Sequence, residues 1–445
     1  MLSSAVVSIL AISLTALPAS ATGVGPSRVA VSARARVAAC APPAASSAAA
    51  FVPGESCTGE RVVITGATGY IGKAVVAEAV RRGYATTAVV RDASRVHDME
   101  SFIGATLVEA EAGNAASLTA PGGPLAPGAA DVVICCLASR QGTRRDAWAV
   151  DYRATKACAD AAVVAGCRHF VLLSAICVRS AERREPNALA FQYAKLEAED
   201  YLRHLARDGV LSHSILRPTA FFKSLSNQFE KVAQGGKFLF FDLGGGACIR
   251  ANPISEPDLA AALVDSIADT RRENAIWRIG GPGPVLSKLD QGRMMAEAAG
   301  QPHPEPIAVP RGVLDGICSA LSAIAALTRL PPVDDAAEVA RILRYYATED
   351  MVTTDPDEVY GSDLLETYYA KVATEGREYD PYVAVFDSKE SVESFGAGGE
   401  GGGEVQQQGG ATKEVIGLRV ATASAAAAAV ATAVATASAT GVGPH

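Results

Sequence analysis

The sequence predicts an α/β fold in which a doubly wound parallel sheet is followed by a small, mainly helical C-terminal substrate lobe. A glycine-rich turn, Gly66-Ala67-Thr68-Gly69-Tyr70-Ile71-Gly72, joins a strand-like run to a helix-like run. After it, apolar strand-like runs alternate with helix-like stretches, which is the pattern of a parallel sheet covered on both faces. Past Pro253 the pattern changes to helices separated by Pro and Gly.

The first strand and its turn predict a Rossmann-type dinucleotide site. Residues 62–64 are β-branched and are expected to form a buried strand. The glycines let the backbone approach a pyrophosphate, and they let the next helix, expected at residues 73–82, pack close to the sheet. The anion would lie at the N-terminus of this helix. The expected cofactor-binding residues of the turn are Gly66, Thr68, Gly69, Tyr70, Ile71 and Gly72.

The end of the second strand, expected at residues 84–90, indicates NADPH. NAD-binding sheets place Asp or Glu here to accept hydrogen bonds from the ribose 2′-hydroxyl. This chain has Arg91, whose planar guanidinium suits a 2′-phosphate, and Arg95 follows one turn later with Ser94 beside it. Asp92 leaves NAD as the alternative, unless its side chain serves only as a turn or cap residue.

Four further strands are expected at residues 106–110, 131–138, 169–178 and 213–216, with helices at 147–165 and 190–207 between them. Ligands of such sheets bind beyond the carboxyl ends of the strands. We therefore expect the nicotinamide to be surrounded by Ala138, Ser139, Arg140, Ser174, Ala175, Arg217, Pro218 and Thr219. In the C-terminal lobe, helices are expected at 256–267, 287–299 and 335–346.

Charge and cysteine content exclude two classes of function. The net charge is −8 and the Lys and Arg residues are scattered, which argues against a nucleic-acid partner. None of the nine cysteines forms a Cys-x-x-Cys pair, and the histidines lack ligand spacing, so no metal site is predicted.

The chain divides into four expected segments. They are a presequence (1–54), an NADPH-binding domain (55–252), a mainly helical substrate-covering region (253–395) and a low-complexity Gly- and Ala-rich tail (396–445). Within the presequence, an apolar run ends in Ala19-Ser20-Ala21, and residues 22–54 contain Arg, Ser and Ala but no acidic residue. This combination predicts two-step import, and it resembles the bipartite presequences of algae whose plastids lie within extra membranes. A single unusual transit peptide is the alternative, and the apolar tract 421–440 is expected to be a tail rather than a membrane anchor.

Several longer blocks resemble the plastid divinyl chlorophyllide a 8-vinyl-reductases, a family of atypical short-chain dehydrogenases. Besides the glycine turn, the similar blocks are 136–140, 170–178, 216–225, 253–256, 280–283 and 344–351. The resemblance implies NADPH-dependent reduction of the 8-vinyl group of divinyl chlorophyllide a, or divinyl protochlorophyllide, to ethyl during chlorophyll biosynthesis in the chloroplast. It leaves room for a peripheral association with thylakoid or envelope membranes. The alternatives are a non-catalytic NADPH-binding regulator or assembly protein, and an isoflavone-reductase-like double-bond reductase.

The chain departs from the usual short-chain dehydrogenases at the catalytic tyrosine. Those enzymes place a Tyr four residues before a Lys on one helix face. Here that position is Phe191, while Tyr193 stands about 200° around the helix from Lys195 and is expected to point elsewhere. Reducing a carbon-carbon double bond needs no phenol to protonate a carbonyl oxygen. Lys195 is expected to be catalytic, binding the nicotinamide ribose and adding positive charge; the alternative is a solvated lysine.

Further site residues are each expected with an alternative. Ser174 is expected to position the nicotinamide amide or a water, or else to bond local backbone. Phe221 and Phe222 would form a flat wall for a tetrapyrrole, or belong to the core. Arg217 and Lys223 would meet the substrate's propionate, or neutralise nearby carboxylates.

Overall fold

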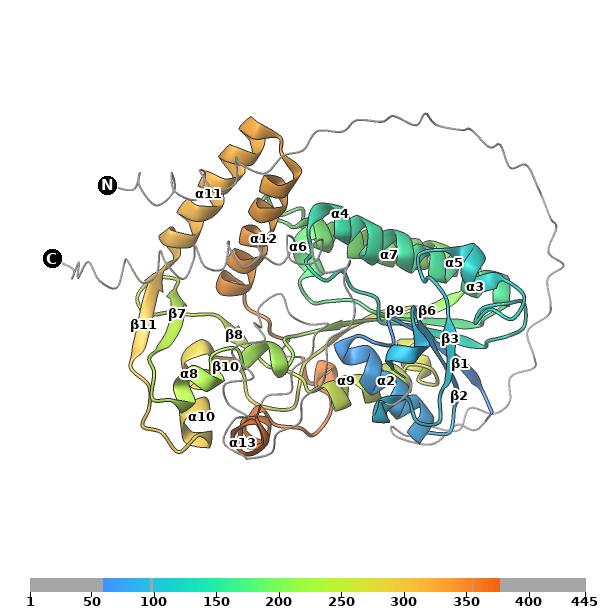
Figure 1. Cartoon of the computed structure of the whole chain (residues 1–445), viewed down its shortest axis with the longest axis horizontal. Coiled ribbons are helices and arrows are strands. Elements are labelled where there is room, and N and C mark those ends of the chain that lie inside the picture. The colour runs from blue at the N-terminus through green and yellow to red at the C-terminus, as the bar shows by residue number, and fades with distance from the viewer. Residues whose placement is uncertain (1–58, 97–98, 354, 377–445) are drawn as a thin grey trace, which may run out of the picture. The chain divides into compact units, whose positions relative to one another are not determined.

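A computed structural model describes residues 59–96, 99–353 and 355–376 of this protein. Its main sheet is seven-stranded and parallel, in the order β3-β2-β1-β4-β5-β6-β9 (Figure 1). The strands are β1 (Arg61–Thr65), β2 (Ala85–Val90), β3 (Thr106–Glu109), β4 (Val132–Cys135), β5 (His169–Leu173), β6 (Ser212–Pro218) and β9 (Ala275–Ile279). The strand order reverses between β1 and β4, and ligands of such sheets bind at this point. The predicted doubly wound fold is therefore confirmed.

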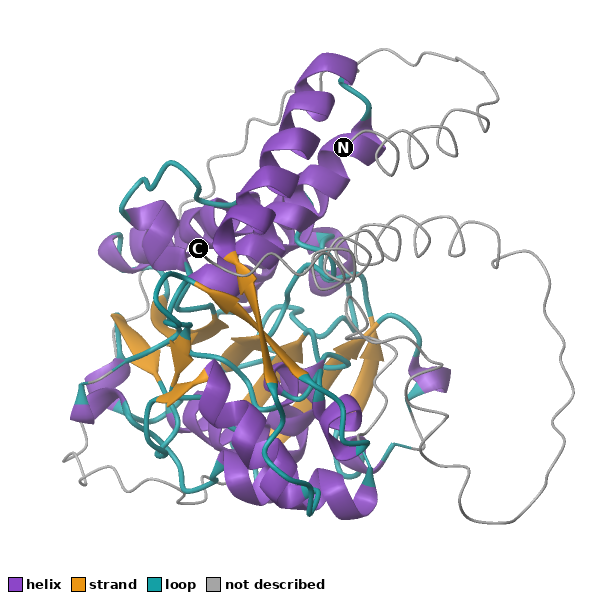
Figure 2. Cartoon of the chain, turned by 90° about the vertical axis from the view of Figure 1, so that its left-hand side faces the viewer, coloured by secondary structure: helices purple, strands orange, loops and turns teal. Residues whose placement is uncertain are grey.

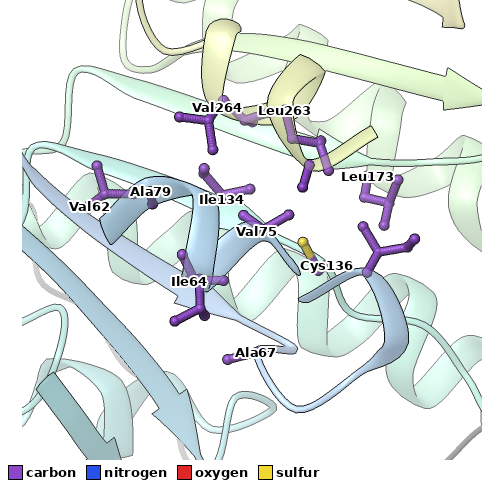
Figure 3. Close-up of a cluster of buried hydrophobic side chains, with 14 of the residues drawn as sticks. Val62, Ile64, Ala67, Val75, Ala79, Ile134, Cys136, Leu173, Leu263 and Val264 are labelled. Carbon is purple, nitrogen blue, oxygen red and sulfur yellow. The ribbon is translucent and has the colours of Figure 1, made fainter. Parts of the chain in front are cut away.

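Helices cover both faces of the sheet because its strands are apolar on both sides. One face carries α3 (Ala115–Thr119), α4 (Arg144–Ala147), the π-helical turn η3 (Trp148–Ala154), α5 (Thr155–Ala165) and α7 (Ala190–Arg207). The other carries α2 (Tyr70–Arg81) and α9 (Glu256–Asp265). Figure 3 shows the core of this second face, where side chains of the sheet and the loops beside it (Val62, Ile64, Ala67, Ile134, Cys136 and Leu173) pack against side chains of α2 and α9 (Val75, Ala79, Leu263 and Val264).

A second, smaller lobe has its own core. Its elements are α8 (Phe229–Ala233), β7 (Phe238–Asp242), β8 (Arg250–Ala251), β10 (Leu286–Ser287), α10 (Lys288–Ala298), β11 (Pro306–Pro310), α11 (Arg311–Thr328), α12 (Pro331–Thr348) and α13 (Leu365–Glu375). Strand β7 pairs with β11 in parallel, and β8 pairs with β10 antiparallel. Buried Phe229, Phe238, Met295 and Tyr369 form the centre of this lobe. The remaining short helices are η1 (Ala93–Arg95), η2 (Glu100–Phe102), α6 (Val178–Glu182), η4 (Lys223–Leu225), η5 (Thr270–Arg272) and η6 (Pro356–Glu358).

The chain crosses between the two lobes more than once, so the boundary expected at residue 252 differs from the structure. Helix α9 and strand β9 follow that boundary but belong to the sheet and its covering layer. Conversely, α8 and β7 precede it and pack in the second lobe. Strand β9 was not predicted from the sequence because it is a short edge strand with the exposed Arg278 next to its last residue, and so lacks a continuous apolar run. The expected presequence (1–54) and the expected tail (396–445) lie outside the described residues.

Element ends differ from expectation mainly beside the site. Strand β4 stops at Cys135 rather than 138, and β5 stops at Leu173 rather than 178, where α6 begins instead. Helix α2 begins at Tyr70, three residues before the predicted start, and α7 has the predicted limits.

Candidate functional site

The glycine turn after β1 is a close-packed cradle that only glycines fit. Gly66 has a φ of +71°, and a Cβ there would stand 2.5 Å from the backbone carbonyl carbon of Cys136. A Cβ at Gly72 would stand 2.1 Å from the carbonyl oxygen of Gly66. Gly69 precedes α2 and caps it without any side-chain hydrogen bond. The first N–H groups of a helix have no intrahelical partner, so this end of α2 fits a pyrophosphate.

The side chains of the turn contribute unequally. That of Ile71 is buried in the core, so this residue can reach a ligand only through its backbone. Tyr70 donates a hydrogen bond from its hydroxyl to Glu256 Oε2 at 2.5 Å, and its ring lies 6.1 Å from the ring of Phe221. Lys223 Nζ lies 5.1 Å from the centre of the Tyr70 ring. The structure therefore brings an expected cofactor residue beside two expected substrate residues.

Arg91 directly follows β2 and is exposed, as is Arg95. Asp92 is occupied as a cap: its Oδ1 accepts hydrogen bonds from the backbone N–H of Ser94 at 3.1 Å and from its hydroxyl at 2.6 Å. A carboxylate used in this way is less available to a ribose hydroxyl. The geometry favours the NADP alternative over the NAD one.

Replacing Arg91 by Glu is expected to raise the dissociation constant for NADPH about 100-fold and that for NADH less than about threefold. A carboxylate would repel the 2′-phosphate, which NADH lacks, whereas two charge-assisted hydrogen bonds are each worth roughly 1.5–3 kcal/mol. Fluorescence titration of both nucleotides measures the ratio. Arg145→Glu, an exposed arginine on α4, is the control and should change neither constant. Equal losses for both nucleotides in Arg91→Glu would contradict a phosphate role.

Lys195 is held beside the carboxyl ends of the strands by a buried ion pair. Its Nζ lies 3.0 Å from Asp151 Oδ1, and the two side chains are 12% and 1% exposed. The same oxygen accepts a hydrogen bond from the backbone N–H of Ser139 at 3.3 Å, which links the pair to the loop after β4. Burial opposes the charge on Lys195, but the charge and hydrogen bond of Asp151 outweigh it and raise the pKa of the ammonium. Lys195 is therefore a fixed cation, not a solvated one.

Asp151 is the site residue that sequence reasoning missed. It belongs to the π-helical turn η3, and turns of this kind often occur at functional sites. Its second carboxylate oxygen, Oδ2, is buried and has no hydrogen-bond partner among the described residues. An isolated Asp in an Ala-rich helical stretch carries no sequence signal, because its pairing depends on where α7 packs.

Helix α7 carries Phe191 at the position where short-chain dehydrogenases have the catalytic tyrosine, with Tyr193 two residues further on. Phe191 is buried in the cluster that also contains Cys177 and Tyr345. Tyr193 is 36% exposed, on a different side of the helix from the buried Phe191 and Ala194. The prediction that Tyr193 points away from the site is confirmed.

Ser174 and Arg217 belong to a buried polar network rather than to an open site. Ser174 is 4% exposed and donates its hydroxyl hydrogen bond to Glu199, not to local backbone. Arg217 pairs with Glu199 at 2.5 Å and with Glu182 at 3.0 Å. Burial opposes the arginine's charge, yet the two carboxylates raise its pKa above the ordinary value. Arg217 therefore takes the alternative role predicted for it, which is to neutralise nearby carboxylates. Its guanidinium is occupied by two glutamates and not held ready for a propionate.

Three other residues that were expected to contact cofactor or substrate have buried side chains. Phe222 is 2% exposed and packs against Tyr368 at a ring distance of 5.6 Å, so it belongs to the core of the second lobe. Lys223 is 8% exposed. Pro218 is buried, and its carbonyl accepts a hydrogen bond from the N–H of Ile176 at 3.0 Å. Ala138 and Ser139 remain accessible in the loop beyond β4.

The described part of the chain contains no group of three metal-ligating side chains. Its cysteines are free thiols, and all but Cys248 are buried.

Comparisons with known proteins add to this geometry. A sequence family described as NAD(P)H-binding matches residues 66–270. A protein of Oryza sativa subsp. indica named divinyl chlorophyllide a 8-vinyl-reductase, chloroplastic, is 42% identical over 358 residues, covering 75% of this chain and 84% of that protein. The Arabidopsis thaliana protein of the same name is 39% identical over 333 residues, covering 71% and 77%.

Solved structures share the fold at low sequence identity. An NADPH-dependent quinone oxidoreductase from Escherichia coli, complexed with NADPH, has a TM-score of 0.50 at 15% identity and covers 71% of this chain and 99% of that one. An epimerase from Methanothermobacter thermautotrophicus has a TM-score of 0.51 at 13% identity, with coverage of 72% and 93%. These similarities concern the fold alone.

Proposed function

Since this chain belongs to the family of divinyl chlorophyllide a 8-vinyl-reductases, we propose that it performs the family's reaction beside Lys195 and Asp151. The protein is an NADPH-dependent oxidoreductase of chlorophyll biosynthesis that reduces the 8-vinyl group of divinyl chlorophyllide a to ethyl. The observation that carries the placement of the reaction is the buried Lys195–Asp151 pair at the carboxyl ends of the strands. Divinyl protochlorophyllide, which carries the same vinyl group, is the second substrate we propose.

The chain's own residues perform three tasks around the cofactor. The N–H groups at the start of α2 bind its pyrophosphate, and Arg91 and Arg95 bind its 2′-phosphate. Lys195 orients the nicotinamide ribose and holds positive charge beside it. When bound, NADPH supplies the hydride that the reduction consumes. Tyr70 and Phe221 provide aromatic surface next to this position, suited to a flat macrocycle.

The missing tyrosine on α7 agrees with this reaction. Hydride addition to the outer carbon of a vinyl group leaves negative charge that a conjugated macrocycle can delocalise. No oxyanion forms, so no phenol is needed at the position where carbonyl reductases place one. Phe191 and the outward-pointing Tyr193 are both consistent with such chemistry.

The test is optical and uses the protein with NADPH and divinyl chlorophyllide a under dim light. Loss of one conjugated vinyl group shifts the Soret band to the blue, so turnover should produce a shift that requires NADPH. No shift, with tight NADPH binding intact, would reject the reductase and favour a non-catalytic NADPH-binding regulator. Oxidation of NADPH with other conjugated alkenes, but not with a divinyl tetrapyrrole, would favour an isoflavone-reductase-like enzyme.

The site of action is the plastid, the location in the names of the relatives. We propose that residues 1–54 direct import in two steps; they lie outside the described residues.

We propose in addition that α11 binds a membrane surface within the plastid. Among the helices of the described residues, α11 is the one that is long and apolar enough to cross a membrane. Only 11% of this 18-residue segment is buried inside the protein. It pairs with α12 as a hairpin (Figures 1 and 2), and α12 carries buried Glu338, so a crossing hairpin would place charge in lipid. At the turn, Leu327 and Leu330 are 86% and 49% exposed. Interfacial insertion of these leucines suits an enzyme with an apolar substrate.

Replacing Leu327 and Leu330 by Asp is expected to reduce binding to phosphatidylcholine–phosphatidylglycerol vesicles at least about tenfold. Each leucine loses roughly 1.5–3 kcal/mol of apolar burial, and the new charges oppose insertion. Co-sedimentation measures the bound fraction. Val164→Asp, which alters an equally accessible apolar residue on α5 (55% exposed), should bind like the unmodified protein. If the unmodified protein does not sediment with vesicles, α11 has another role.

A further inference from the structure

Tyr346 of α12 reaches the Lys195 site from the second lobe. Its ring packs edge-to-face against that of Tyr345, with centres 5.7 Å apart at 88°. The two phenols differ in environment: Tyr345 is 5% exposed and its hydroxyl pairs with Ser180 Oγ at 3.1 Å. The Tyr346 side chain is 44% exposed, yet its hydroxyl is a hydrogen-bond partner of the Cys177 thiol, a residue that is 1% exposed. The ring of Tyr346 therefore borders open space while its hydroxyl lies inside.

Polar contacts fix α12 against the helix that carries Lys195. Glu338 Oε1 accepts a hydrogen bond at 2.8 Å from the backbone N–H of Ala190, the first residue of α7. Beyond the other end of α12, the carbonyl of Asp350 accepts a hydrogen bond from Arg179 of α6. Tyr346 is thus held between two anchors, and its position relative to Lys195 follows from the fold.

The groups around the Tyr346 hydroxyl keep its proton in place. Burial raises the pKa of this phenol well above its ordinary value, and the neighbouring Cys177, Tyr345 and Asp151 act in the same direction. Burial also raises the pKa of Cys177 to about 11, although the positive charge of Lys195 acts in the opposite direction. Phenol and thiol are both neutral at pH 7, beside a charged ammonium.

We propose that Tyr346 is the catalytic acid of the vinyl reduction. The inference rests on the proposed function and assigns the proton that the reaction consumes. With a hydride added at the outer vinyl carbon, the electron pair of the carbon-carbon π bond moves to the inner carbon and into the macrocycle. The O–H bond of Tyr346 breaks and a C–H bond forms at the inner carbon, which completes the ethyl group. The vinyl group is reduced and the nicotinamide oxidised. The phenolate, stabilised by the nearby ammonium of Lys195, regains a proton from water.

This assignment places the acid on a different helix from the usual tyrosine, α12 instead of α7. In the described structure α7 offers Phe191 and the exposed Tyr193, whereas α12 places a phenol beside the Cys177 thiol, which in turn senses the charge of Lys195. A lobe that closes over the substrate would then supply a catalytic group as well as shape.

The first test compares Tyr346→Phe with the matched control Tyr345→Phe in the full chain. Tyr346→Phe should lower kcat about 100-fold or more, as loss of a general acid does. Its dissociation constant for NADPH should change less than twofold, because the ring is kept. Tyr345→Phe, which loses only the contact with Ser180, should retain at least about half of kcat. Equal kcat for Tyr346→Phe and the unmodified protein, or equal losses in both variants, would overturn the assignment.

The second test needs no turnover. With ¹³C-labelled tyrosine, the resonance that disappears in Tyr346→Phe identifies this phenol in the NMR spectrum. In the protein with NADPH it should titrate well above pH 10, because burial raises its pKa and the neighbouring Cys177 and Tyr345 act in the same direction. An ordinary pKa would place the hydroxyl outside the cluster and refute the proposal. If the unmodified protein binds NADPH but never reduces the divinyl substrate, the proposed function fails and the inference with it; a defect confined to the Tyr346 experiments leaves that function standing.

Discussion

Asp151→Asn is expected to lower kcat for vinyl reduction about 100-fold, although Asp151 itself was not suggested by any motif. Lys195 Nζ and Asp151 Oδ1 are 3.0 Å apart, and both side chains are largely removed from water. Without the carboxylate, burial acts on Lys195 unopposed and lowers the pKa of the ammonium, since the pair now holds it above the ordinary value. A neutral or displaced amine cannot stabilise charge beside the nicotinamide. Loss of one such electrostatic contact costs roughly a factor of 10²–10³ in rate.

The double variant sharpens this prediction. Lys195→Met alone should cause a similar loss, and Lys195→Met with Asp151→Asn should be no worse than either single change, because the two residues act as one unit. The measurement is a double-mutant cycle: kcat and KM are determined for the unmodified protein, both single variants and the double variant. The NADPH dissociation constant of each is measured separately. The control is the pair Lys156–Asp160 on neighbouring α5, 2.7 Å apart but 36% and 41% exposed. Lys156→Met should leave kcat within about twofold. Independent, additive losses for Lys195 and Asp151 would show that they do not function as a pair.

Arg217→Met is expected to destabilise the protein by about 3–5 kcal/mol without acting on substrate affinity. The change would leave Glu199 buried without its cation, and breaking one partner of a buried ion pair typically costs this much. The fully buried Glu199 also accepts the hydroxyl hydrogen bond of Ser174, so the disturbance reaches the end of β5. Urea unfolding measures the change in free energy, and KM for the divinyl substrate measures the affinity.

A rescue experiment separates the structural role from the substrate role. Glu199→Gln added to Arg217→Met removes the stranded charge while keeping an acceptor for Ser174, and should recover at least about half of the lost stability. Arg293→Met breaks an exposed pair with Asp290, 57% and 40% accessible, and should change stability by less than about 0.5 kcal/mol. A large rise in KM for Arg217→Met with unchanged stability would instead restore the propionate contact that the sequence suggested.

Residues whose roles depend on local geometry were predictable from the sequence. The glycine turn needs small residues at fixed spacing because backbone must approach backbone, and the structure shows what larger side chains would meet at Gly66 and Gly72. Helical periodicity alone placed Tyr193 away from the site, and it is exposed. The resemblance of longer blocks identified the family, which the relatives confirm.

For residues whose roles depend on distant partners, the sequence left two alternatives open and could not choose between them. Arg217 and Ser174 looked like site residues at strand ends, but α7 brings Glu199 against both and commits them to structure. Phe222 was placed in the second lobe's core by α13 and its Tyr368.

The sequence by itself therefore determined the fold class, the dinucleotide cradle and the family, because contiguous residues encode a turn, a periodicity and a motif. Only the tertiary structure decided that Asp151 holds Lys195, that β9 completes the sheet, and that Tyr346 meets Cys177 across about 170 residues of chain. Those pairings arise from how helices of two interwoven lobes pack, and no local pattern records which side chains such contacts bring together.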